Sequence, residues 1–93
     1  MAHTVTLYWV APSGSVVTSY NVKRATSASG PFTSIVFVST TSFVDSNVVE
    51  GQSYFYEVDA VNATGEGAPS NVASASVPFQ IPGAPTGLVA TVA

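Results

Sequence analysis

The side chains that could do chemistry are few in this sequence, and they lie apart. His3 is the single histidine, so a catalytic triad or a zinc site built on it would lack companions. Glu57 and Asp59 form the closest acidic pair on one strand face. Paired carboxylates can act as acid and base or bind calcium, but residues two apart on a strand flank each other without enclosing a site. We expect a solvated His3, and a surface ion pair between these acids and Lys23.

Two further motifs lie in the segment after Asp59. Thr64–Gly–Glu–Gly67 is glycine-rich, but a phosphate cradle needs the N-terminus of a following helix, and a strand pattern follows here. Gly65, Glu66 and Gly67 are instead candidates for a binding loop. Asn62–Ala63–Thr64 fits the sequon for N-linked glycans, although we expect no glycan there. The sequence has no cysteine, which excludes disulfides and thiolate zinc sites, and we predict no metal and no cofactor.

Length and composition set the class of protein. The 93 residues suffice for one domain. Apolar residues make up 46% and charged residues only 8%, which favours one apolar core under a neutral, hydroxyl-rich surface. The net charge is −3 with two basic residues, so the basic field that nucleic acids require is absent. No apolar run approaches the length of a membrane span.

The elements that position these residues are alternating segments. From Tyr54 to Asn62, the side chains of Tyr54, Tyr56 and Val58 share one face, and the acids lie on the other. This period of two predicts a half-buried strand at the centre of a sheet, entered through a turn at Gly51. No segment has a helical apolar period, so we predict an all-β sandwich. Further strands are expected at 3–10, 18–25, 32–38, 42–45 and 70–77, with an edge strand at 32–38 and a loop at 63–69.

The order of short motifs along these strands resembles the fibronectin type III domain over almost the whole chain. The motifs are Leu7–Tyr8–Trp9 with Pro12, Tyr20–Asn21–Val22–Lys23–Arg24, Gly30–Pro31–Phe32, Phe43–Val44–Asp45, Val48–x–x–Gly51–x–x–Tyr54, Val58–x–Ala60–Val61–Asn62, Gly65 and Pro69–Ser70–Asn71. The resemblance implies an immunoglobulin-like sandwich of seven strands. It also implies that Trp9 is buried between the sheets and that the Tyr54 hydroxyl bonds backbone upstream, as a tyrosine corner. The remaining structural positions are Tyr20, Val22, Gly51, Tyr56, Val58 and Leu88.

The sequence departs from the family at its ends. The family places a strand A, with the pattern Pro–x–x–Pro/Gly–Leu–x–Val, before strand B. Here strand B starts at residue 3, and that pattern occurs at Ile81–Val92. We therefore predict the chain order B, C, C′, E, F, G, A, with a sandwich at 3–77, a proline-rich linker at 78–85 and strand A at 86–93. Strand A would fold back or be exchanged between chains, and a stiff prolyl linker favours self-association by exchange of residues 86–92.

Two functions fit these observations. The first is a non-catalytic module that spaces neighbouring domains of a secreted or surface-displayed multidomain protein, of the bacterial type, within a tandem array. The alternative is a module that binds a polysaccharide or a surface protein through the B–C loop (residues 11–17) and the F–G loop (residues 63–69). An enzyme is not expected, because no nucleophile–base pair or metal set is available.

Overall fold

The structure, a computed structural model, describes residues 3–14, 16–79 and 84–93, and its regular elements are all β-strands. No part of the chain that it describes forms a helix of the length and apolarity needed to cross a membrane. In chain order the strands are β1 (Val5–Tyr8), β2 (Ser19–Ala25), β3 (Thr33–Val38), β4 (Ser42–Asp45), β5 (Ser53–Asn62), β6 (Gly65–Pro69) and β7 (Ala73–Ser76).

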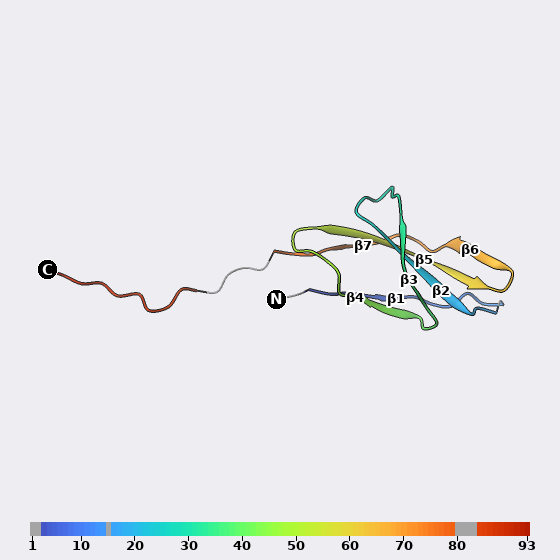
Figure 1. The fold of residues 1–93 in the computed structure, drawn as a ribbon, viewed down its shortest axis with the longest axis horizontal. Coiled ribbons are helices and arrows are strands. Elements are labelled where there is room, and N and C mark those ends of the chain that lie inside the picture. Colours follow the sequence, from blue (N-terminus) through green and yellow to red (C-terminus); the bar gives the residue numbers. More distant parts are fainter. Residues whose placement is uncertain (1–2, 15, 80–83) are drawn as a thin grey trace.

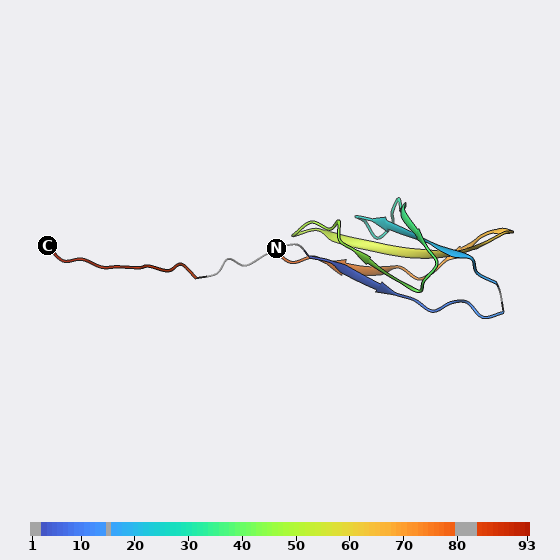
Figure 2. The same ribbon diagram turned by 60° about the horizontal axis from the view of Figure 1, so that its bottom comes forward.

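The strands form two sheets that are layered on each other (Figures 1 and 2). The smaller sheet pairs β1 with β4, and the larger has the order β3-β2-β5-β6, with β7 also paired to β5. Every one of these pairs is antiparallel. The predicted all-β, immunoglobulin-like sandwich is confirmed. The strand β5 lies at the centre of the larger sheet, and β3 lies at its edge, because it pairs only with β2.

Alternating side chains decide which face of each strand is buried. On β5, Tyr54 and Tyr56 are only 5% and 2% exposed, and they pack with Val77 in the core. Rings of this size bury enough apolar area to dominate a small core. The other inward side chains are Tyr20 and Val22 of β2 and, from the smaller sheet, Val5 and Leu7.

The segment after β5 differs from the prediction. The expected loop at 63–69 is largely a strand, since Gly65–Pro69 forms β6 and pairs with β5. The ladder breaks at Ser70, whose Oγ accepts a hydrogen bond of 3.0 Å from Val58 N, and β7 then resumes the pairing along β5. Glycine and proline are depleted in strands, so a strand made mostly of them gives no strand pattern in the sequence.

The C-terminal segment forms no strand within the chain. Residues 84–93 run away from the sandwich, and they are exposed (Figure 1). Strand A, expected at 86–93, is therefore not paired with its own sandwich. The described residues still contain seven strands, because β6 forms in addition to the strand predicted at 70–77. The linker predicted at 78–85 falls partly on residues 80–83, which lie outside the described residues.

Trp9 lies between the two sheets but is half-buried, which corrects the expectation of a buried indole. Its ring meets the edge of the Tyr20 ring, with the two centroids 5.5 Å apart and an angle of 63° between the planes. Among the described strands, β1 pairs only with β4. Trp9 therefore follows a strand that has one edge unpaired among the described residues.

Candidate functional site

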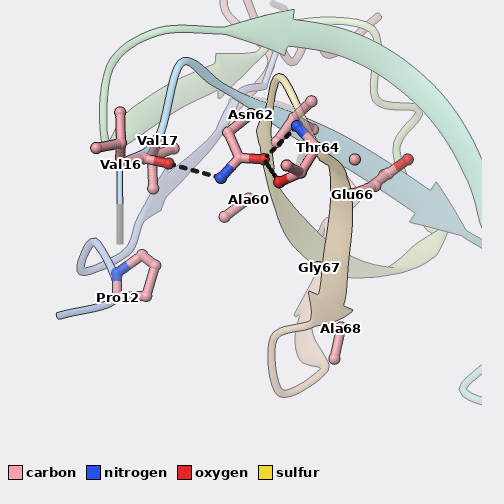
Figure 3. Close-up of a pocket in the computed structure, with 11 residues that line it drawn as sticks. Pro12, Val16, Val17, Ala60, Asn62, Thr64, Glu66, Gly67 and Ala68 are labelled. Atoms are coloured by element: carbon pink, nitrogen blue, oxygen red, sulfur yellow. Dashed lines mark hydrogen bonds between the residues drawn. The ribbon is translucent and has the colours of Figure 1, made fainter. Parts of the chain in front are cut away.

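A pocket lies at the end of the sandwich where the loop between β1 and β2 meets the hairpin of β5 and β6 (Figure 3). Its volume is about 390 Å³, within the range of small-molecule sites. Pro12, Val16 and Val17 form one wall, and residues 60–62 and 64–68 form the other. Both loops of the alternative binding hypothesis, and all of Gly65, Glu66 and Gly67, thus contribute to this one hollow.

Asn62 holds the two walls of the pocket together. Its Nδ2 donates a hydrogen bond of 2.9 Å to Val16 O, and its Oδ1 accepts bonds from Thr64 N at 2.9 Å and Thr64 Oγ1 at 2.5 Å (Figure 3). An Asn that bonds the backbone two residues later closes a tight turn. Both ends of the amide are therefore engaged in shaping the loops.

Glu66 joins the pocket to a polar cluster on the outer face of the larger sheet. Its Oε2 accepts a hydrogen bond of 2.7 Å from Asn21 Nδ2 and lies 3.9 Å from Lys23 Nζ. The neighbouring Asp59 carboxyl and the hydrogen bond from Asn21 lower the pKa of Glu66 below its ordinary value. Ser34 Oγ completes the cluster by donating to Asn21 Oδ1.

Asp59 is buried, which corrects the prediction of a surface ion pair. The residue is 3% exposed, and its Oδ2 lies 2.5 Å from Lys23 Nζ. Burial raises the pKa of Asp59, with a further contribution from Glu66, and the Lys23 ammonium only partly opposes this rise. The same ion pair raises the pKa of Lys23. Glu57, on the same strand face, is half-buried beside this cluster.

A second polar network joins the two sheets inside the sandwich. Asp45 Oδ2, at the end of β4, accepts bonds from Arg24 Nη1 at 2.7 Å and from the Tyr56 hydroxyl at 2.8 Å. Asn47 N donates to Asp45 Oδ1 at 3.1 Å. Burial alone would raise the pKa of Asp45, but these three hydrogen bonds outweigh it and hold the pKa below its ordinary value. Burial, and then the bond to Asp45, raise the pKa of Tyr56.

This network was not predicted from the sequence, although the sequence carries one signal of it. Arg24 shares the inward face of β2 with Tyr20 and Val22, and a charge on an inward face requires a partner. The guanidinium also lies over the Tyr54 ring, 5.2 Å from its centroid.

The predicted structural residues differ in their contacts and in their burial. The Tyr54 hydroxyl accepts a hydrogen bond of 2.9 Å from Val49 N, upstream in the chain, and Gly51 has a φ of 79°. Val58 is half-buried, and Leu88 is 97% exposed, far from the core. The buried members are Tyr20, Val22, Tyr54 and Tyr56.

The pocket and the networks differ in what they can do chemically. In the described residues there is no group of three metal-ligating side chains, and the ions of both networks are engaged with one another. The pocket offers apolar walls, the carboxylate of Glu66 and the polar edge of the Asn62 turn. Such a surface can bind a ligand by contact and hydrogen bonds.

Comparisons with known proteins agree with the fold. A crystal structure of an Fn3-like protein from Clostridium thermocellum is 37% identical, covers 84% of this chain and 80% of its own, and has a TM-score of 0.72. Human receptor-type tyrosine-protein phosphatase F is 34% identical over 90% of this chain, and amylopullulanase of Thermoanaerobacter thermohydrosulfuricus is 35% identical over 77%. The chain spans only 4% and 5% of the lengths of these two proteins.

The family model of the fibronectin type III domain matches residues 1–76, which contain all seven strands. This family is found as a generally non-catalytic part of multidomain proteins, enzymes included. With its two antiparallel sheets and the motifs that first suggested the resemblance, the chain belongs to the fibronectin type III family.

Proposed function

We propose that the chain is a non-catalytic structural module that spaces neighbouring domains of a secreted or surface-displayed bacterial protein. The observation that carries the proposal is the small share of its relatives that the chain spans, 4% of the receptor-type phosphatase and 5% of the amylopullulanase. In both proteins the matching segment is one part of a much longer chain. The bacterial setting is supported by the relatives from Thermoanaerobacter and Clostridium, at 35% and 37% identity.

The internal contacts also support a structural role. The buried charges are used to join elements, since Asp45 connects β4 to β2 and β5, and Asp59 connects β5 to β2. A module that transmits position benefits from such ties, because Asp45 fixes the two sheets relative to each other and Asp59 fixes two strands within one sheet.

The proposal is tested by placing the chain between two fluorescent proteins. Energy transfer should report one fixed separation that is lost when the module unfolds in urea. A Gly/Ser linker of equal length serves as the control, because it behaves as a flexible coil. A transfer efficiency equal to that of the flexible linker would contradict the spacer function.

A second candidate function is supported by the pocket between the two loops. We propose, as the alternative, that it binds a carbohydrate or a short stretch of a surface protein, with Glu66 as the hydrogen-bond acceptor. Affinity electrophoresis in gels containing pullulan, soluble starch or xylan tests the carbohydrate. The spacer function predicts unchanged migration in all three, whereas retardation would favour the binding module.

A variant pair locates any binding that is found. Gly67 has no positive φ, and a Cβ there would lie 3.6 Å from Ala60 O, at ordinary contact distance. Gly67→Gln therefore adds a side chain at the pocket without straining the backbone. Ala28→Gln, in the exposed turn between β2 and β3, is the matched control. Binding in the pocket requires that only Gly67→Gln reduces the retardation.

A further inference from the structure

The outer edge of β1 is free for pairing within the described part of the chain. Trp9 N donates to Thr41 O at 3.0 Å, so the odd-numbered residues of this segment direct their backbone groups toward β4. Successive residues of an antiparallel strand direct these groups to opposite edges. The N–H and C=O groups of Thr4, Thr6 and Tyr8 therefore point to the side where no strand lies. Such an edge is a template for another strand.

A groove follows this edge, and its lining is largely apolar. One part, of about 370 Å³, lies between Leu7–Val10 on one side and Tyr56, Val58 and Ala73 on the other. Its polar lining residues are Glu57, Ser70 and Asn71. A second part, of about 190 Å³, continues past Trp9 toward Pro12. We call these two parts together the edge groove. The indole Nε1 of Trp9 is buried and has no acceptor among the described residues.

The C-terminal segment has the pattern and length that fit this groove. Residues 86–92 equal residues 4–10 in number. Leu88, Ala90 and Val92 fall on one face of an extended strand and are all apolar, while Val89 and Thr91 fall on the other. Leu88 and Val92 are 97% and 95% exposed in the single chain. A strand of this pattern gains by placing the first face in an apolar groove and its backbone on a free edge.

The direction of the chain separates the segment from its own groove. The chain leaves β7 at the end of the sandwich where β1 begins (Figures 1 and 2). An antiparallel partner of β1 must start at the opposite end, near Val10. Residues 78–85 would have to run back along the whole sandwich, and extended they reach about 26–29 Å, little more than the roughly 23 Å of residues 4–10. Pairing with a second copy requires no such reversal of the chain.

We propose that residues 86–92 of one copy pair antiparallel with the free edge of β1 in a second copy and place Leu88, Ala90 and Val92 in its edge groove. The contact is heterologous, because the donated segment and the groove are different surfaces. Such contacts close as a ring or continue as a head-to-tail chain. The second part of the edge groove shares Pro12, Ala60 and Ala68 with the loop pocket. The assembly needs no ligand in that pocket, so it does not depend on the proposed function.

Sedimentation velocity of the full chain over a concentration series tests the assembly. The average mass should rise with concentration above the 9.5 kDa of one chain. Leu88→Asp should restore the monomer at all concentrations, whereas Val89→Asp, on the opposite face of the same segment, should assemble like the parent. Both residues are exposed in the single chain, so neither change threatens the sandwich. A parent that stays monomeric overturns the proposal, as does assembly that survives Leu88→Asp or is lost equally in both variants.

Trp9 is the only tryptophan, and it lines the groove, so its fluorescence locates the contact. The full-length Leu88→Asp chain, which keeps its edge groove but lacks a competent donor, is titrated with a synthetic peptide of residues 84–93. We expect a saturable shift of the Trp9 emission, with affinity at least tenfold weaker for the peptide that carries Asp at position 88. An emission spectrum that does not change would overturn the seating of the segment in this groove.

Discussion

The Tyr56 hydroxyl donates a 2.8 Å hydrogen bond to Oδ2 of Asp45, and this contact joins the larger sheet to the smaller one. Both residues are 2% exposed. The bond is charge-assisted, and water cannot replace it without opening the sandwich. Cohesion between the sheets therefore depends on directional contacts such as this bond as well as on apolar packing.

Removing that hydroxyl isolates its contribution. Tyr56→Phe should lower the free energy of unfolding by about 1–3 kcal/mol, because Asp45 loses a buried donor while the ring remains. Urea unfolding followed by circular dichroism measures the loss. Tyr8→Phe is the matched control and should have almost no effect, since Tyr8 is 81% exposed. Equal losses in the two variants would contradict a special role for the inter-sheet bond.

Acid should weaken the fold through Asp45. Its folded-state pKa lies below the ordinary value, so its carboxylate stabilises the fold above the unfolded-state pKa of about 4. That stabilisation is lost as the pH falls through the folded-state pKa. The free energy of unfolding should thus decrease below about pH 4, and it should decrease less in Asp45→Asn. A variant with the same acid dependence as the parent would assign the effect to other carboxyl groups.

The contribution of Asp59 to the pH dependence of the free energy of unfolding should have the opposite sign. Its folded-state pKa is raised by burial, so the protonated carboxyl stabilises the fold, and this contribution is lost as the pH rises through the folded-state pKa. Asp59→Asn keeps a neutral side chain of the same shape. We expect the variant to gain stability relative to the parent as the pH rises above about 4, measured by urea unfolding at each pH. A relative loss over this range would show that the Lys23 ion pair outweighs burial.

Comparing Gly51→Ala with Gly14→Ala separates the cost of backbone strain from the cost of side-chain crowding. The φ angles of the two glycines are 79° and 78°, but a Cβ at Gly51 would lie 2.1 Å from the end of the Phe79 ring, whereas a Cβ at Gly14 meets nothing within 4 Å. Each change to Ala should cost about 1–2 kcal/mol from the left-handed backbone. Phe79 is 73% exposed, so its ring can swing aside. We expect the two costs to agree within about 1 kcal/mol, and a much larger loss for Gly51→Ala would show that Phe79 is held in place.

Asn62 should control the order of both pocket loops. Asn62→Ala removes its bonds to Val16 and Thr64 and should lower stability by about 1–2 kcal/mol. Asn62→Asp keeps the acceptor for Thr64 and loses only the donor to Val16 O. Hydrogen exchange by NMR should therefore show a faster Thr64 amide in Asn62→Ala alone. Unchanged exchange in both variants would mean that the hairpin holds its shape without this side chain.

The sequence was sufficient for the fold because each strand repeats one simple pattern. The alternation around Tyr54 and Tyr56 identified β5 and its buried face, and the expected bounds of β4, Ser42–Asp45, are those of the structure. The alternation did not predict β6, because its composition is not typical of a strand. Gly65–Pro69 pairs with β5 despite its glycines, because the turn at Asn62 delivers it to that edge.

The polar contacts were less accessible to sequence reasoning. Alternation placed Asp59 correctly on the outer face, but its burial depends on side chains from β2 and β6 that come together only in the folded sheet. The pairing of Arg24 with Asp45 likewise crosses from one sheet to the other. A period of two describes which way a side chain points and carries no information about what lies opposite.

One feature of the topology has a mechanical consequence. The start of β1 and the end of β7 lie at the same end of the sandwich (Figures 1 and 2). Tension applied between these two points would load the outermost ladders at one end, so their hydrogen bonds would open one after another, like a zipper. A strand laid along β1 from the opposite end would move one attachment point across the molecule, and the same tension would then strain a whole ladder at once. Pairing of a strand with the free edge of β1 would in this way raise the force that the sandwich resists before it unfolds.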